Sequence, residues 1–273
     1  MKYELKPLTV GAILDQTILI LKEHLGLFLK IMLCLAVPAG LVMDFFVART
    51  MPMPAPNPTP EEVAELLQTQ FRFLFQTMLP FGALMILVIL PLTHGAIIHA
   101  AAQIYFGRKV GVADAYRVAL KRGFPMIGTW ILTYLLVAGG TMLCVLPGIL
   151  AGFWCALAST IVMIEGVSGF AAIRRSYHLM QAASLEHYLQ CFLLYVVIFF
   201  IQVGVGAGEG FLLDPRVASF IGTFLQVVTR PLELICILVF YFSCRCRAEN
   251  FDLVRLAQEV ANAPTTPAQA LQG

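Results

Sequence analysis

The residues with the most unusual chemistry lie in the last apolar stretch of the sequence, FIGTFLQVVTRPLELICILVFYF. Arg230 and Glu233 stand near its middle, where an ionisable side chain in a membrane-spanning helix costs about 2.5–3.5 kcal/mol. Gln226, Arg230 and Glu233 are four and three residues apart, so a continuous helix places all three on one face. We expect that face to point into a helix bundle or into a water-filled cavity.

These three residues have two interpretations at the level of sequence. In the first, they form an intramembrane polar site that contacts an anionic lipid headgroup or a transported solute. In the second, Arg230 and Glu233 form an internal ion pair that holds the helix packing in place. Pro231 bears on both, because it disfavours helical backbone at Arg230 and frees a carbonyl that the guanidinium can satisfy.

A second candidate site is the adjacent pair Arg174 and Arg175, which follows the fourth apolar stretch. Guanidinium groups bind phosphate bidentately, so the pair can contact lipid phosphates. The alternative is that both arginines only determine topology beside an anionic leaflet. The two interpretations are compatible with each other.

The remaining polar residues give no pattern typical of an enzyme. The sequence lacks G-x-S-x-G, G-x-x-x-x-G-K-[ST] and H-E-x-x-H, and its five histidines have no ligand spacing. We expect His94, His99 and Gln103 to form interhelical hydrogen bonds. Cys244 and Cys246 form a lone C-x-C, whereas zinc needs four ligands. The sequence therefore predicts no catalytic residues, no metal and no cofactor.

Composition indicates the environment that these residues occupy. Hydrophobic residues make up 59% of the chain, charged residues 12%, and the mean hydropathy is +0.84. An ordinary soluble domain has about a quarter of its residues charged. The net charge of +2 is too small to favour nucleic acid as a partner. We expect an all-α, polytopic integral membrane protein that contacts membrane lipids.

Because a spanning helix needs ~20 mostly apolar residues, the sequence predicts six transmembrane helices. We place them near residues 26–47, 78–103, 124–145, 149–164, 188–205 and 218–243. A structural turn, LPGI at 146–149, separates the third from the fourth. A Pro-rich run before Glu61 predicts extended backbone, followed by a helix with acidic residues in its first turn.

The flanking charges predict the orientation. One set of connections and both ends carry most of the basic residues: Lys2, Lys6, Lys22, Arg108, Lys109, Arg117, Lys121, Arg122, Arg174, Arg175, Arg245, Arg247 and Arg255. The opposite loops carry fewer basic residues and several acidic ones: Arg49, Arg72, Arg216, Glu61, Glu62, Glu65, Glu209 and Asp214. By the positive-inside rule, both termini of this multi-pass protein are predicted to be cytoplasmic.

Three short amphipathic helices are predicted on the cytoplasmic side, near residues 10–25, 112–121 and 170–180. Thr9 and Ser168 stand where N-caps would begin the first and third. Each helix precedes an apolar hairpin, which divides a single membrane domain, residues 1–253, into possible units 8–107, 110–166 and 167–250. Residues 254–273 form a cytoplasmic tail with a disordered end.

Short motifs along the chain resemble those of a known bacterial family. They are Leu8-Thr9-Val10-Gly11-Ala12-Ile13-Leu14-Asp15, Pro147-Gly148, Glu165-Gly166, Ala172-Ile173-Arg174-Arg175-Ser176 and the segment from Arg245 to Leu253. The chain resembles, over nearly its whole length, uncharacterised membrane proteins named for the glycerophosphoryl diester phosphodiesterase membrane domain. Ser243 departs from the pattern, because many relatives carry an acidic residue there.

The resemblance implies that catalysis in fused members belongs to a separate soluble phosphodiesterase domain, which is absent here. We therefore expect a non-enzymatic protein, a scaffold or a module that binds a partner or lipid. The alternative is a lipid- or solute-handling permease or translocation accessory that uses the polar face of residues 226–233. Whether the chain has a protein partner or forms a homo-oligomer is left open by the sequence.

Overall fold

A computed structural model of the chain describes residues 6–50, 59–212 and 215–250, which form helices and no strand. The helices are α1 (Val10–Glu23), α2 (Leu25–Thr50), α3 (Pro60–Phe73), η1 (Leu74–Met78), α4 (Leu79–Leu84), η2 (Met85–Ile89), α5 (Leu90–Tyr105), α6 (Val112–Leu143), α7 (Val145–Cys155), α8 (Ala158–Glu165), α9 (Phe170–Gln181), α10 (Ser184–Leu212) and α11 (Pro215–Glu249).

Six stretches of the described residues are helical, long and apolar enough to cross a membrane, so the predicted all-α, multi-pass fold is confirmed. They are Leu25–Phe46, Val63–Tyr105, Val112–Leu143, Val145–Glu165, Leu185–Gly206 and Ile221–Glu249. Each overlaps one predicted span. The second is longer than predicted, because α3, η1, α4, η2 and α5 follow one another without a break.

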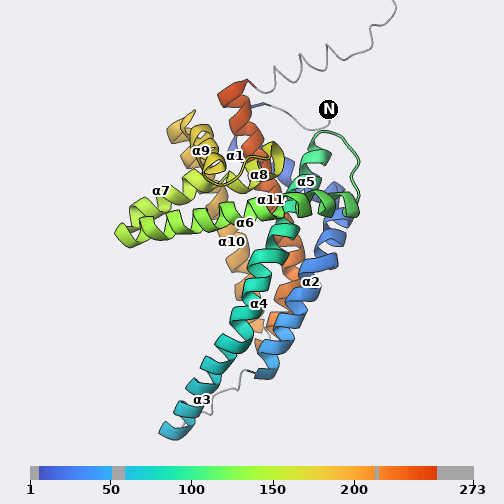
Figure 1. Cartoon of the computed structure of the whole chain (residues 1–273). Helices are drawn as coiled ribbons and strands as arrows, with labels where there is room; N and C mark the ends of the chain where they lie inside the picture. Colours follow the sequence, from blue (N-terminus) through green and yellow to red (C-terminus); the bar gives the residue numbers. More distant parts are fainter. Residues whose placement is uncertain (1–5, 51–58, 213–214, 251–273) are drawn as a thin grey trace, which may run out of the picture.

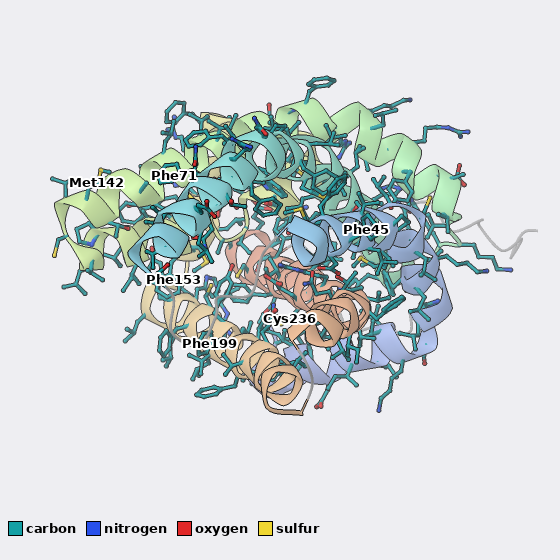
Figure 2. All side chains as sticks on the ribbon, turned by 90° about the horizontal axis from the view of Figure 1, so that it is seen from below. Phe45, Phe71, Met142, Phe153, Phe199 and Cys236 are labelled. Carbon is teal, nitrogen blue, oxygen red and sulfur yellow. The ribbon has the colours of Figure 1, made fainter. Side chains whose placement is uncertain are left out.

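α11 is the central helix. It packs against α1, α2, α5 and α10, and Figure 1 shows it rising between α2 and α10, with its last turns at the same end of the molecule as the N-terminus. From Leu234 to Cys244, every residue of its upper half except Ile237 is buried, as expected of a helix that is mostly apolar all round. Figure 2 shows Cys236 in the middle of the bundle.

The hairpin of α6 and α7 lies crosswise to this bundle (Figures 1 and 2). It contacts the bundle mainly through α5, α8 and α9. Its far end projects away from the other helices, where Met142 is 90% exposed and is labelled at the tip in Figure 2. No charged residue occurs between Gly123 and Ile164, so both sides of the hairpin are apolar.

The predicted turn at 146–149 is wrong by a few residues. The chain reverses at Cys144, which ends α6 and begins α7, so Pro147 and Gly148 lie in the first turn of α7. Proline is tolerated there because its missing N–H has no partner in a helix's first turn. Helix packing explains the glycine at position 148, because a Cβ there would lie 2.9 Å from Thr141 Cα on α6.

The three amphipathic helices differ from the prediction in one case. α1 and α9 are separate helices, whereas residues 112–121 are the first turns of α6. These turns and the apolar part form one continuous helix, which passes through Gly123 and Pro125 without a break. Whether α1 and α9 rest on a membrane surface stays a prediction.

The two predicted N-caps have different outcomes. Thr9 caps α1 as predicted, since its side chain accepts a hydrogen bond from the Ala12 N–H at 3.4 Å. Ser168 does not cap α9, because the cap is Gly169, with φ 64° and ψ −140°. This backbone region is essentially restricted to glycine, so the helix begins one residue later. The Pro-rich run and the tail at 254–273 lie outside the described residues.

Candidate functional site

The predicted face of α11 carries an ion pair in the middle of the bundle. Arg230 Nη1 donates to Glu233 Oε2 at 3.2 Å, and Gln202 Nε2 of α10 donates to the same oxygen at 3.3 Å. The bond to Glu233 is the one hydrogen bond that Arg230 donates to a described residue, although a guanidinium has five N–H donors. Arg230 and Glu233 are 37% and 21% exposed, so the pair is not packed like the core around it.

Two cavities border this pair at successive levels of α11. The lower cavity, about 220 Å³, lies among α2, η2, α5 and α11 and is lined by Met32, Ala36, Val37, Gly40, Met43, Asp44, Met85, Ile89, Leu90, Thr93, His94, Thr223, Gln226 and Arg230. The upper cavity, about 350 Å³, lies among α5, α6, α7, α8, α10 and α11. It is lined by Leu90, His94, Ile98, Trp130, Thr133, Tyr134, Gly152, Cys155, Ala156, Ser159, Thr160, Tyr195, Arg230, Glu233, Leu234 and Ile237.

The three residues predicted from spacing all line these cavities. Gln226 lines the lower cavity, Glu233 the upper one, and Arg230 both. Leu90 and His94 of α5 also line both, so together with Arg230 they form the boundary between the two spaces. An anion in either cavity would therefore meet the same guanidinium.

Neighbouring helices contribute polar groups that spacing along one helix could not reveal. The His94 ring packs edge-on against Trp130 at 5.2 Å, and the Trp130 indole N–H donates to Ser159 Oγ at 2.9 Å. In the lower cavity, Thr223 Oγ1 donates to Asp44 at 2.5 Å. The sequence does not require a partner for Asp44, because a side chain near the end of the first span can reach the membrane interface.

Arg174 and Arg175, the candidate lipid-phosphate contacts, occupy different environments. Arg174 is exposed on α9, where its Nε donates to His178 Nε2 at 3.4 Å. Arg175 donates to both Glu165 oxygens, at 3.0 and 3.3 Å, and pairs with Glu249. Burial alone would lower the pKa of Arg175, but the hydrogen bonds and charges of both carboxylates raise it above its usual value. Arg175 is thus already held by two carboxylates.

These contacts belong to a larger charge cluster, Glu165, Arg175, Tyr241, Arg245 and Glu249, which joins α8, α9 and α11. The Tyr241 hydroxyl donates to Glu165 at 2.7 Å, and Arg245 pairs with Glu249 at 3.0 Å. Two guanidinium groups face two carboxylates, so the cluster is neutral overall. Such mutual pairing is what permits charges to be partly buried.

Segments far apart in the sequence meet around this cluster. Glu165, Arg175 and the end of α11 supply its members. Nearby, the Leu8 N–H donates to Ser243 Oγ at 2.8 Å and ties the start of the chain to α11. Ser176 accepts from the Leu157 N–H at 3.2 Å. Of the motifs quoted above, Pro147-Gly148 lies apart from the cluster, at the start of α7.

No group of three His, Cys, Asp or Glu residues that could hold a metal occurs among residues 6–50, 59–212 and 215–250. Cys244 and Cys246, the close pair in the sequence, are both buried in the bundle. Within the described residues, no side-chain hydrogen bond of His99 or Gln103 tests their predicted interhelical role, which stays a prediction.

The fold and the site together define a multi-pass helical membrane protein with two mostly apolar cavities beside one arginine of its last spanning stretch. No protein-family model, curated protein or solved structure matches the chain. Its function therefore has to be inferred from its own geometry.

Proposed function

We propose that this protein is a non-enzymatic, multi-pass protein of the bacterial inner membrane that binds an anionic lipid or solute at Arg230. One observation carries the proposal: Arg230 is the charged residue of α11 that lines both cavities. Its side chain is 37% exposed, so the guanidinium is not enclosed by the protein.

The chemistry of the cavities favours an anion. Glu233 engages one N–H of Arg230, so other guanidinium donors stay available to an oxyanion. Inside a bundle the effective dielectric constant is low, which strengthens a charge-assisted hydrogen bond. Thr160, Ser159 and the His94 ring add polar groups to the upper cavity. Sites with mostly apolar walls and a few convergent polar groups are typical of small-molecule binding.

The proposal places both termini in the cytoplasm. The two ends of the described chain lie on the same side of the bundle in Figure 1, and the basic connections predicted to be cytoplasmic lie there too, including that of Arg108 and Lys109. The positive-inside rule assigns that side to the cytoplasm. The proposal also places the chain in the family named for the glycerophosphoryl diester phosphodiesterase membrane domain, on the motifs quoted above, and assigns no catalytic step to the chain.

The competing candidate is a scaffold or partner-binding module, in which Arg230 and Glu233 are an internal ion pair. The hydrogen bond from Gln202 to Glu233 favours it, because it ties α10 to α11 through the same carboxylate. In that case both residues act on stability alone.

Native mass spectrometry of protein extracted with its membrane lipids distinguishes the two. We expect the wild type to retain a defined additional mass and the Arg230→Ala variant to lose it. Arg117→Ala is the matched control, because Arg117 is an exposed arginine that lines neither cavity. Retention of the same mass by Arg230→Ala would refute the proposal. Absence of any retained mass, with Arg230→Ala merely less stable, would establish the scaffold role.

A further inference from the structure

The upper cavity opens toward the side of the bundle. Tyr134 of α6 and Tyr195 of α10 both line it, yet they are 64% and 37% exposed. Both residues belong to stretches that are long and apolar enough to cross a membrane. The exposed parts of Tyr134 and Tyr195 therefore mark where the upper cavity reaches the surface of the molecule, and we call this opening the lateral mouth.

The lining of the upper cavity combines two kinds of side chain. At the mouth stand two tyrosines, side chains with an apolar ring and a polar tip. The cavity is also lined by Ser159, Thr160 and Arg230, and the Thr133 hydroxyl oxygen is buried without a hydrogen-bond partner among the described residues. A buried hydroxyl without a partner is costly, and a polar ligand would satisfy it.

We propose that the ligand is a lipid with a phosphate headgroup, which enters through the lateral mouth between Tyr134 and Tyr195 and places its phosphate at Arg230. The inference rests on the proposed function and specifies its substrate class. A cavity of about 350 Å³ lies at the small end of the range for ligand sites, so it holds a headgroup while the acyl chains stay in the bilayer.

Gly152 offers a way to close this cavity without touching the ion pair. It lines the upper cavity, and a Cβ built on it meets nothing within 4 Å, so a leucine side chain can extend into the space. Replacing a helical glycine also favours the helix by about 0.8–1 kcal/mol, so the variant is expected to fold. Gly128 on α6 is the matched control, since it is equally open and lines neither cavity.

The test is native mass spectrometry of protein in nanodiscs made from phosphatidylglycerol and phosphatidylcholine, with a parallel incubation in inorganic phosphate. We expect the wild type and Gly128→Leu to retain phosphatidylglycerol, and Gly152→Leu to retain it roughly tenfold less, a loss of about 1.4 kcal/mol. Equal retention of phosphatidylglycerol by Gly152→Leu and Gly128→Leu would overturn the inference. So would retention of inorganic phosphate in place of lipid.

The outcomes also separate this inference from the proposed function. If Arg230→Ala loses a bound anion that Gly152→Leu keeps, the anion site stands and lateral entry is wrong. If no anion is lost in Arg230→Ala, both are wrong. A second measurement needs no cavity variant: headgroup spin-labelled phosphatidylglycerol should quench Trp130 fluorescence in a Trp154→Phe background. Unquenched Trp130 fluorescence would contradict a headgroup in the upper cavity.

Discussion

Removing the charge of Glu165 should loosen the junction of three helices. Glu165 lies at the end of α8 and contacts Arg175 of α9 at 3.0 Å and the Tyr241 hydroxyl of α11 at 2.7 Å. Arg245 lies 3.9 Å away. In Glu165→Gln the side-chain shape stays, but two guanidinium groups then face the single carboxylate of Glu249.

The structure brackets the size of the effect. The Glu165 and Arg175 side chains are 16% and 29% exposed, between the exposed pairs that contribute about 0–1 kcal/mol and the buried pairs whose disruption costs about 3–5 kcal/mol. We therefore expect Glu165→Gln to lower the free energy of unfolding by about 2 kcal/mol and Glu165→Ala by about 3 kcal/mol, since alanine also loses the Tyr241 hydrogen bond.

Reversible unfolding by SDS in mixed micelles measures these differences, and a thermal scan should show Tm lowered by about 5–10 °C for Glu165→Ala. Glu186→Gln is the control, because Glu186 pairs with Arg247 at the surface and its loss should have little effect. The Glu165→Ala and Arg175→Ala effects should be less than additive. A wild-type free energy of unfolding in Glu165→Gln, or full additivity in the double variant, would refute this reasoning.

Two further predictions concern helix contacts. Gly148→Val should destabilise the hairpin by about 1–3 kcal/mol, because its Cβ would lie 2.9 Å from Thr141 Cα; thermal unfolding beside the tolerated Gly152→Leu checks it, and equal Tm values would contradict the close contact. Thr223→Val should cost about 1–2 kcal/mol, since it removes the hydrogen bond to Asp44 but keeps the side-chain shape; the SDS titration of Asp44→Asn and the double variant should show coupling, and independent effects would argue against the bond.

The fold was largely predictable because the six spans are long runs with few charges. The errors arose where helices pass beyond those runs or where backbone geometry decides. α6 begins at Val112, well before its apolar part, and continues through Gly123 and Pro125, although such residues usually favour a helix end. The turn fell at Cys144 rather than at Pro147, since proline is equally suited to a helix's first turn. A proline in a turn and a proline in the first turn of a helix have the same local sequence signature.

The candidate site was predictable along one helix and not across helices. Spacing placed Gln226, Arg230 and Glu233 on one face, and all three line cavities. Spacing could not reveal Gln202 as the partner of Glu233, because the two residues belong to different helices. The partners of Arg175 were unpredictable for the same reason, although Glu249 lies within a motif that the sequence already displayed.

The crosswise α6–α7 hairpin sets a problem for the surrounding bilayer. The apolar part of α6, residues 124–143, is about 30 Å long, which matches the hydrocarbon core, whereas the turns from Val112 onward carry charged residues. A helix of this length fits the core only when it stands close to the membrane normal. Because the hairpin lies crosswise to the bundle, an orientation that stands α11 upright lays α6 flatter in the membrane. The bilayer beside the hairpin would then meet a lower hydrophobic height than the bilayer beside the bundle.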